Sequence, residues 1–230
     1  MDPTILTPRL KLTLITTAER GSPELEWYHQ LRSDEKATYF SIFGRSKTLE
    51  DTEKLLKGEV TTNADSDYRA AYAVHKLVPS TQGETPASSE SKAEFIGWVS
   101  LKSIPPGQDA KTGLGTLPEH LVIPDAAAAT TLTVEVGYAF LPKAWGCGYA
   151  PEAVKAVFEA CKKGVSFWRP YEKLYVRAIV NEENPPSMRV LDKSGMVKKG
   201  VYHWKGKPIF IAGRTTEESY LHIFGLHLLE

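Results

Sequence analysis

The chain has 230 residues, 42% of them hydrophobic, and its 28 lysines and arginines balance 28 aspartates and glutamates to a net charge of zero. This supplies enough apolar material for one large domain, whereas a neutral balance without a long basic block argues against nucleic-acid binding. No apolar run reaches the length of a membrane span, and the N-terminus lacks the layout of a signal peptide, so we expect a soluble, cytoplasmic protein with no membrane partner.

The first half of the chain predicts these elements in order: a strand over 7–14, a helix from Pro23 to about Leu31, a helix from Thr48 to Gly58, and antiparallel strands over 68–77 and 94–101. Two stretches interrupt this order, at 79–93 and 103–130, and both are predicted to be flexible loops because they are polar or irregular and rich in proline. The second contains a possible short helix near 118–121.

A strand follows over 133–140, where one face is apolar and the other small or polar: Val134, Val136, Tyr138 and Phe140 against Thr133, Glu135, Gly137 and Ala139. An amphipathic helix comes next, with Pro151 in its first turn and Gly164 at its C-cap.

Between this strand and this helix lies a loop with two glycines, Gly146 and Gly148. Glycine lets the chain turn sharply and aim successive N–H groups at an anion, helped by the positive end of the following helix. A simple tight turn explains the same glycines. A Walker loop does not fit because Tyr149 follows Gly148, and a dinucleotide fingerprint does not fit because Pro151 occupies the third glycine position.

A last strand–helix unit runs from a strand over 174–180 into a short helix that Asn184 caps and Gly195 ends. Strands at 207–212 and 219–226 complete the chain. We find no repeat and no domain boundary, so the mixed α/β order predicts a single domain over 1–230.

The loop resembles motif A of the GNAT (GCN5-related) N-acetyltransferases, Gln/Arg-x-x-Gly-x-Gly/Ala, with Lys143 at the Gln/Arg position. The phrase over 145–153 looks most like the RimJ/RimL-type branch, which acetylates protein N-termini, other amines or antibiotics. A second segment follows that branch's pattern Asn-x-x-Ser-x-Arg-Val-Leu-x-Lys-x-Gly-Phe, with Met196 in place of the phenylalanine. Its matching residues are Asn184, Ser187, Arg189, Val190, Leu191, Lys193 and Gly195.

The resemblance implies a mixed α/β GNAT fold over nearly the whole chain, whose mostly antiparallel twisted sheet is flanked by helices and splayed at an acetyl-CoA site. It implies that pantetheine follows the main chain of Phe140 and Leu141, and that Asn181 and Asn184 bond it. The pyrophosphate would be held by Lys143, Gly146, Cys147, Gly148, Tyr149 and Ala150. Arg189 and Lys193 would meet the 3′ phosphate, or are ordinary exposed helix charges.

Amine acetylation needs a group that removes a proton from the ammonium and a donor for the leaving thiolate. Glu135 is the candidate base, directly or through water; the alternative is a solvated or ion-paired strand glutamate. Ser187 is the candidate donor, because the tyrosine that many GNAT enzymes use falls at Leu191; the alternative is a structural serine of the first helical turn.

Cysteine and metal chemistry are not expected. Cys147 has no histidine or aspartate near it in sequence to activate it, and the two cysteines and six histidines form no ligand set. We therefore expect Cys161 to lie in the core and no metal to bind, and the resemblance implies that Cys147 contributes its main-chain N–H.

The acceptor amine is not selected by the sequence, and neither is a monomer or a homodimer. Several aromatic residues either line an acceptor pocket or belong to the core: Trp27, Tyr28, Tyr39, Phe40, Phe43, Tyr202 and Trp204. A non-catalytic acyl-CoA sensor or scaffold is the main alternative. A parallel-sheet nucleotide-binding protein is disfavoured by the hairpin-like run over 68–101.

Overall fold

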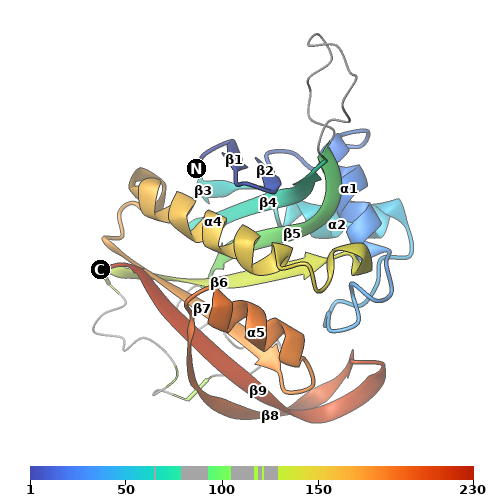
Figure 1. Cartoon of the computed structure of the whole chain (residues 1–230). Helices are drawn as coiled ribbons and strands as arrows, with labels where there is room; N and C mark the ends of the chain where they lie inside the picture. Colours follow the sequence, from blue (N-terminus) through green and yellow to red (C-terminus); the bar gives the residue numbers. More distant parts are fainter. Residues whose placement is uncertain (65, 79–92, 105–116, 119–120, 122–128) are drawn as a thin grey trace.

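The computed structural model describes residues 1–230 except 65, 79–92, 105–116, 119–120 and 122–128. Its strands form one sheet in the order β1-β2-β4-β5-β6-β7-β9-β8, with β3 paired to β4, and neighbours are antiparallel except β6 and β7 (Figure 1). The strand bounds are β1 Thr4–Leu6, β2 Leu10–Leu14, β3 Thr62–Ala64, β4 Asp67–Leu77, β5 Ala93–Ser103, β6 Thr131–Phe140, β7 Lys173–Asn181, β8 Val197–Ile211 and β9 Arg214–Leu229. The predicted mixed α/β fold with a mostly antiparallel central sheet is confirmed.

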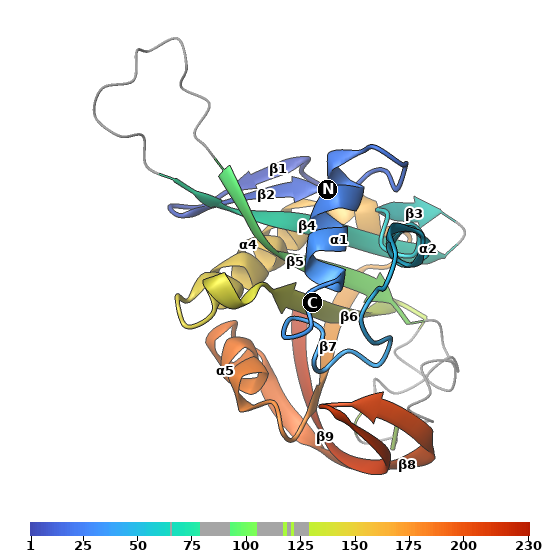
Figure 2. The same cartoon turned by 90° about the vertical axis from the view of Figure 1, so that its right-hand side faces the viewer.

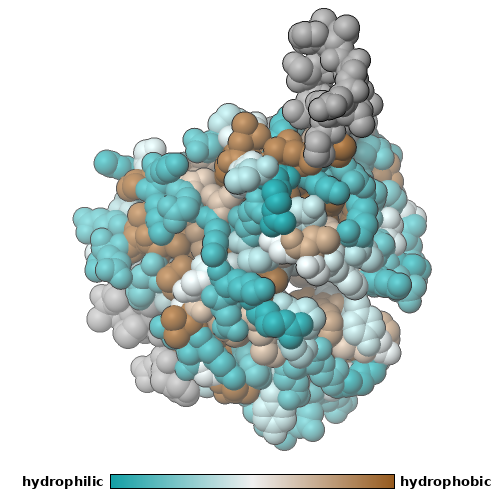
Figure 3. All heavy atoms as spheres, viewed as in Figure 1, coloured by the Kyte–Doolittle hydropathy of each residue, from teal (hydrophilic) through white to brown (hydrophobic). Residues whose placement is uncertain are grey.

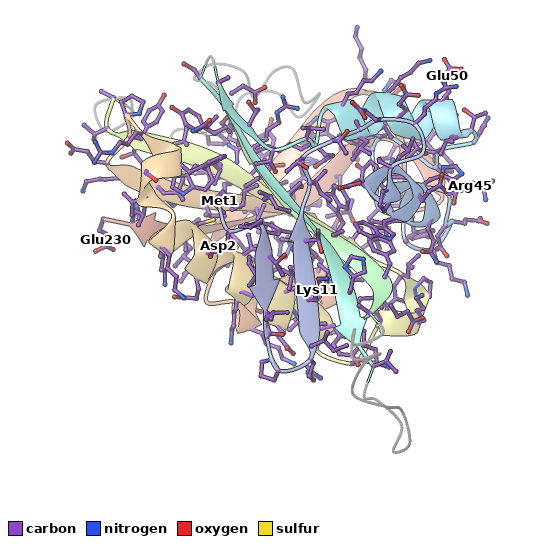
Figure 4. All side chains as sticks on the ribbon, turned by 90° about the horizontal axis from the view of Figure 1, so that it is seen from above. Met1, Asp2, Lys11, Arg45, Glu50 and Glu230 are labelled. Carbon is purple, nitrogen blue, oxygen red and sulfur yellow. The ribbon has the colours of Figure 1, made fainter. Side chains whose placement is uncertain are left out.

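Helices cover both faces of the sheet: α1 (Pro23–Arg32) and α2 (Leu49–Lys57) on one, α4 (Tyr149–Lys163) and α5 (Pro185–Lys193) on the other (Figures 1 and 2). Seen from above, the edge strands near Asp2 and Lys11 lie between α4 and the pair α1 and α2 (Figure 4). The labels Arg45 and Glu50 lie on the side of the molecule that carries α1 and α2. No helix in the described ranges is long and apolar enough to cross a membrane.

Local sequence sets where these helices begin. The Ser22 hydroxyl accepts the Leu25 N–H at the start of α1. At α2, the Thr48 and Asp51 side chains bond each other's backbone N–H groups in a capping box. These caps satisfy amides that a helix start leaves without an internal partner, so the predicted starts are confirmed.

The sheet opens between β6 and β7. Their parallel ladder runs from Thr131↔Lys173 to Glu135↔Arg177 and stops there. Beyond it, β6 stays paired with β5 as far as Phe140, while β7 stays paired with β9 as far as Asn181. The two strands therefore diverge at their carboxyl ends, which is the predicted splay.

The core has three parts. The largest lies between the sheet and α4 and includes Cys161, which is fully buried as expected. A second lies under α1 and α2. In the third, Leu117 and Leu121 pack on Trp204 of β8 and on Ile223 of β9. The first two clusters pack against β5 and β6 from both faces of the sheet, so these two strands form a rigid side of the splay.

Two strand predictions need correction. The strand expected over 7–14 begins only at Leu10, as β2. Residues 7–9 form a tight turn that follows β1, a strand that was not predicted; in this turn the Thr7 N–H bonds Leu10 O at 2.9 Å and the Thr7 hydroxyl accepts the Leu10 N–H at 2.9 Å. The two short terminal strands are parts of one long hairpin, β8–β9, whose turn at Ala212 and Gly213 has φ of 53° and 76°. Both residues in the left-handed region are typical of a two-residue hairpin turn.

The short strand β3 was not predicted. The helix expected near 118–121 and the loops expected at 79–93 and 103–130 lie largely outside the described residues.

Candidate active site at the splayed strands

The loop after β6 leaves the sheet along a fixed path. The Leu141 N–H still bonds Ile96 O of β5 at 2.9 Å, and a 3-10 turn over Pro142–Ala144 comes next. The indole N–H of Trp145 then donates back to Phe140 O at 2.7 Å. The Leu141 N–H and the Phe140 C=O, both expected to lie along pantetheine, therefore have partners within the chain.

Gly146 and Gly148 take the backbone conformations that the loop was expected to need. Their φ angles are 73° and 77°, a region that costs a residue with a side chain about 1–2 kcal/mol. Within the described chain, no N–H group from Gly146 to Ala150 donates a hydrogen bond to another residue. These donors lie at the N-terminus of α4, which is the geometry of an anion cradle.

The charged residues beside the loop are paired. Lys143, at the family's Gln/Arg position, bonds Glu94 of β5 with Nζ and Oε1 2.8 Å apart, and this bond lowers the pKa of Glu94. Arg9, from the turn between β1 and β2, bonds Glu152 of α4 through Nε at 2.7 Å and donates from Nη1 to Cys147 O at 2.9 Å. Neither Arg9 nor its partner Glu152 was predicted at the site.

Tyr138 lies in the splay. The Leu141 N–H bonds Ile96 O and the Ile104 N–H bonds Thr133 O, so odd-numbered residues of β6 direct their main-chain groups toward β5. Alternation turns the N–H and C=O of Tyr138 to the other edge, from which β7 has diverged. Strand ends like this one present main-chain donors and acceptors to an extended ligand.

The Tyr138 side chain reaches α5. Its hydroxyl lies 2.8 Å from Ser187 Oγ and also bonds Ser187 O at 3.0 Å. Burial raises the pKa of Tyr138 above its usual value, so the phenol stays protonated at neutral pH. Ser187, in the first turn of α5, is thus joined to β6 across the splay, and Leu191 is fully buried.

At the end of β7, two asparagines organise the turn into α5. Asn181 donates from Nδ2 to Ser219 Oγ at 2.9 Å and accepts the Glu183 N–H at 2.8 Å. Asn184 caps α5 by accepting the Ser187 N–H at 3.2 Å, as predicted from its cap position. Arg189 and Lys193 are exposed on α5.

Glu135 lies on the opposite face of β6 from Tyr138, at the point where the ladder to β7 ends. Its Oε2 is 3.2 Å from Nη2 of Arg177, and the side chains of Glu135 and Arg177 are 34% and 3% exposed. Lys102 stands opposite Glu135 on β5 and bonds Glu59, which also accepts the Tyr28 hydroxyl at 3.4 Å. Carboxylates and cations therefore alternate across this face, and Glu135 is ion-paired yet reachable by water.

The aromatic residues considered for an acceptor pocket divide into three groups. Three are half-buried: Trp27, Phe40 and Tyr202. Tyr28 and Trp204 are buried in the core, whereas Tyr39 and Phe43 are exposed in the segment between α1 and α2. That segment touches the β8–β9 turn, because the Ala212 N–H bonds Tyr39 O at 2.9 Å. The segment and the hairpin tip therefore meet on the face of the sheet that carries Glu135.

The surface is hollowed between the half of the molecule that holds α4 and the half that holds α5 and the β8–β9 hairpin (Figure 3). No group of three or more histidine, cysteine, aspartate or glutamate residues in the described ranges has the arrangement of a metal site.

Splayed strands, a glycine loop at a helix start and a second, capped helix are the features of an acyltransferase fold. The comparison with known families agrees. The family described as the acetyltransferase (GNAT) domain matches residues 9–197. The chain therefore belongs to the GNAT acetyltransferases, enzymes that use acetyl-CoA as the acyl donor and bind an amine acceptor.

Solved structures share the fold at low identity. A GNAT-family acetyltransferase from Bacillus anthracis has a TM-score of 0.58 at 20% identity and covers 98% of both chains. Spermidine N-acetyltransferase from Vibrio cholerae, in complex with CoA and spermine, has a TM-score of 0.55 at 18% identity and covers 94% of this chain and 95% of that one. Ribosomal-protein-S5-alanine acetyltransferase from Vibrio fischeri has a TM-score of 0.55 at 17% identity and covers 96% of each. No curated protein matches the sequence.

Proposed function

We propose that this enzyme transfers the acetyl group of acetyl-CoA to a primary amine by direct attack in a ternary complex, and that it is of the RimJ/RimL type. The observation that carries the proposal is the splay, with main-chain groups of Tyr138 on one edge and the donor-rich glycine loop at its end. Pantetheine lies along the main chain of Phe140 and Leu141, where Asn181 and Asn184 bond it. The pyrophosphate of CoA lies on the loop over 143–150, and Arg189 and Lys193 contact the 3′ phosphate.

Glu135 acts as the base through water. Its carboxylate is ion-paired with Arg177 and 34% exposed, so water can reach it and donate a hydrogen bond to it. A bound water passes the ammonium proton to it, and the neutral nitrogen then attacks the thioester carbon. The C–N bond forms as the C–S bond breaks, and the second proton that the nitrogen loses is transferred to the departing thiolate, which leaves as the CoA thiol.

Ser187 stabilises the departing sulfur. The Tyr138 hydroxyl has one proton, and when it donates it to Ser187 Oγ instead of Ser187 O, the Ser187 hydroxyl can donate to the thiolate. The protonated, buried phenol thus orients a serine that would otherwise rotate. The acceptor is a protein N-terminus, a small amine or an antibiotic amine.

The first test is a thermal-shift screen with acetyl-CoA, CoA and nucleotides, followed by thiol release with amines, polyamines and N-terminal peptides. We expect stabilisation by both CoA species and turnover with one acceptor class. No stabilisation by either CoA species would reject the proposal. Stabilisation without turnover on any acceptor would favour the alternative, a non-catalytic acyl-CoA sensor or scaffold.

The second test concerns Glu135. Glu135→Gln should lower kcat about 10²-fold at neutral pH, because it removes the proton acceptor, and kcat should recover as the pH approaches the pKa of the amine. Glu218→Gln removes an exposed, ion-paired strand glutamate on β9 and is the matched control. A pH profile unchanged by Glu135→Gln would leave Glu135 with only its ion-pair role.

A further inference from the structure

Arg9 holds the glycine loop from outside it, although it lies far away in sequence. Its guanidinium makes three kinds of contact: with the Glu152 carboxylate through Nε at 2.7 Å, with Cys147 O through Nη1 at 2.9 Å, and with the face of the Tyr149 ring, whose centroid is 4.8 Å from Cζ. The planar fork of arginine can make the first two contacts at once, which an ammonium cannot reproduce.

The turn between β1 and β2 fixes this geometry. The Thr7 hydroxyl bonds Glu152 Oε1 at 2.6 Å, while Arg9 takes Oε2. The β1–β2 turn thus bonds both carboxylate oxygens of Glu152, which lies in the first turn of α4. Gly148 is packed under Arg9, because a Cβ there would lie 3.5 Å from Nη2.

The contact with Cys147 O has a consequence for the neighbouring amide. The Cys147–Gly148 peptide is trans, so its C=O and its N–H point in opposite directions. Because Arg9 binds the C=O, the Gly148 N–H must face away from Arg9, and it has no acceptor among the described residues. The same arginine also offsets the charge of Glu152, a carboxylate that would repel an anion at this helix start.

We propose that Arg9 is a positioning residue for the diphosphate of the acyl donor, acting through Cys147 O and Glu152 without itself binding the donor. The proposal rests on the proposed function, since it takes the donor to be acetyl-CoA with its diphosphate on the loop. It assigns the β1–β2 turn to the site, which otherwise consists of β6, α4 and α5.

The test compares two acyl donors. S-acetylpantetheine carries the thioester but lacks the diphosphate. Arg9→Ala should raise the Kd and KM for acetyl-CoA about tenfold while leaving kcat unchanged, and should leave kcat/KM for S-acetylpantetheine at the wild-type value. Arg9→Lys, which keeps the charge and the fold but loses the fork, should raise the KM for acetyl-CoA in the same direction.

Arg20→Ala is the matched control, because Arg20 makes a similar exposed pair with Glu53 at 2.6 Å and does not touch the loop. Equal effects of Arg9→Ala on both donors would indicate a general folding role and overturn the proposal. So would wild-type KM values for Arg9→Ala, or full retention of affinity in Arg9→Lys. A wild-type protein that binds S-acetylpantetheine and acetyl-CoA equally well would contradict the diphosphate site itself, and one that binds neither would reject the proposed function.

Discussion

The two turns at the open end of the splay use their polar groups in opposite ways. After β6, the loop keeps its N–H groups from Gly146 to Ala150 without partners among the described residues, while Arg9 bonds Cys147 O and the loop's own Trp145 bonds Phe140 O. After β7, the side chains of Asn181 and Asn184 bond their own turn and the neighbouring strand.

This difference assigns different tasks to the two turns. A loop whose exposed donors have no protein partner is prepared for an anion, because several N–H groups at a helix start can bond one negatively charged ligand together. A turn whose side chains are internally bonded is rigid and fixes the start of the next helix, where Ser187 Oγ lies 2.8 Å from the Tyr138 hydroxyl. The turn after β6 is built to bind an anion, and the turn after β7 is built to position Ser187.

The largest expected effect is at Gly146. Gly146→Ala should weaken acetyl-CoA binding by up to about 30-fold, because a side chain disfavours φ of 73° and any relaxation turns the loop donors away. Gly21→Ala is the control: φ there is 86°, and in both glycines a Cβ would meet no atom within 4 Å. Isothermal titration with acetyl-CoA measures the difference. Equal affinities of the two variants would break the distinction between the turns.

Next in size is the Tyr138–Ser187 pair. Ser187→Ala and Tyr138→Phe should each lower kcat about tenfold at an unchanged KM for acetyl-CoA, because each removes one member of a single hydrogen-bonded unit. The double variant should match the single ones, since the two groups share one interaction. Tyr220→Phe, on the exposed face of β9, is the control. Additive losses would show that the two hydroxyls act separately.

Sequence alone predicted the local features of the site. Alternation over 133–140 placed Glu135 and Tyr138 on opposite faces, and glycine spacing placed the loop. The pairs that complete the site join residues distant in the chain: Tyr138 and Ser187 are 49 positions apart, and Arg9 and Cys147 are 138 apart. The hydrophobic periodicity of a sequence cannot predict such contacts, because they depend on how β1, β6 and α5 are arranged in space.

The β8–β9 hairpin was underestimated for another reason. Much of β8 is exposed at the edge of the sheet, and its lysines and glycines interrupt the apolar alternation that predicts a strand. Charged residues on an edge strand discourage pairing with other chains. The residues that protect this edge therefore also make the strand hard to predict from the sequence. Only the parts near Ile211 and Leu221, which are buried, were recognised.

A smaller effect is expected at Asn184. Asn184→Ala removes the cap of α5 and should lower the free energy of unfolding by about 1 kcal/mol, which is a fall in Tm of roughly 2–4 °C for a chain of this size. Asn184→Ser keeps a capping oxygen and should restore most of the loss. Thermal unfolding and the KM for acetyl-CoA are measured together. A large rise in KM at an unchanged Tm would make Asn184 mainly a ligand of the cofactor, and the two turns would then resemble each other.

The smallest effect is expected at Lys143, whose charge is already engaged by Glu94 at 2.8 Å on the surface. Lys143→Gln should therefore raise the KM for acetyl-CoA by no more than about threefold, as exposed ion pairs contribute little. Glu94→Gln is the sharper variant. The pKa of Glu94 is held low by Lys143, so this carboxylate is ionised at neutral pH and competes with a phosphate for the ammonium. Removing it should lower the KM, because Lys143 can then turn toward the loop. An unchanged or higher KM in Glu94→Gln would mean that the loop binds its anion through main-chain N–H groups alone. The turn after β6 would then bind its ligand without any side chain, whereas the turn after β7 is organised by side chains.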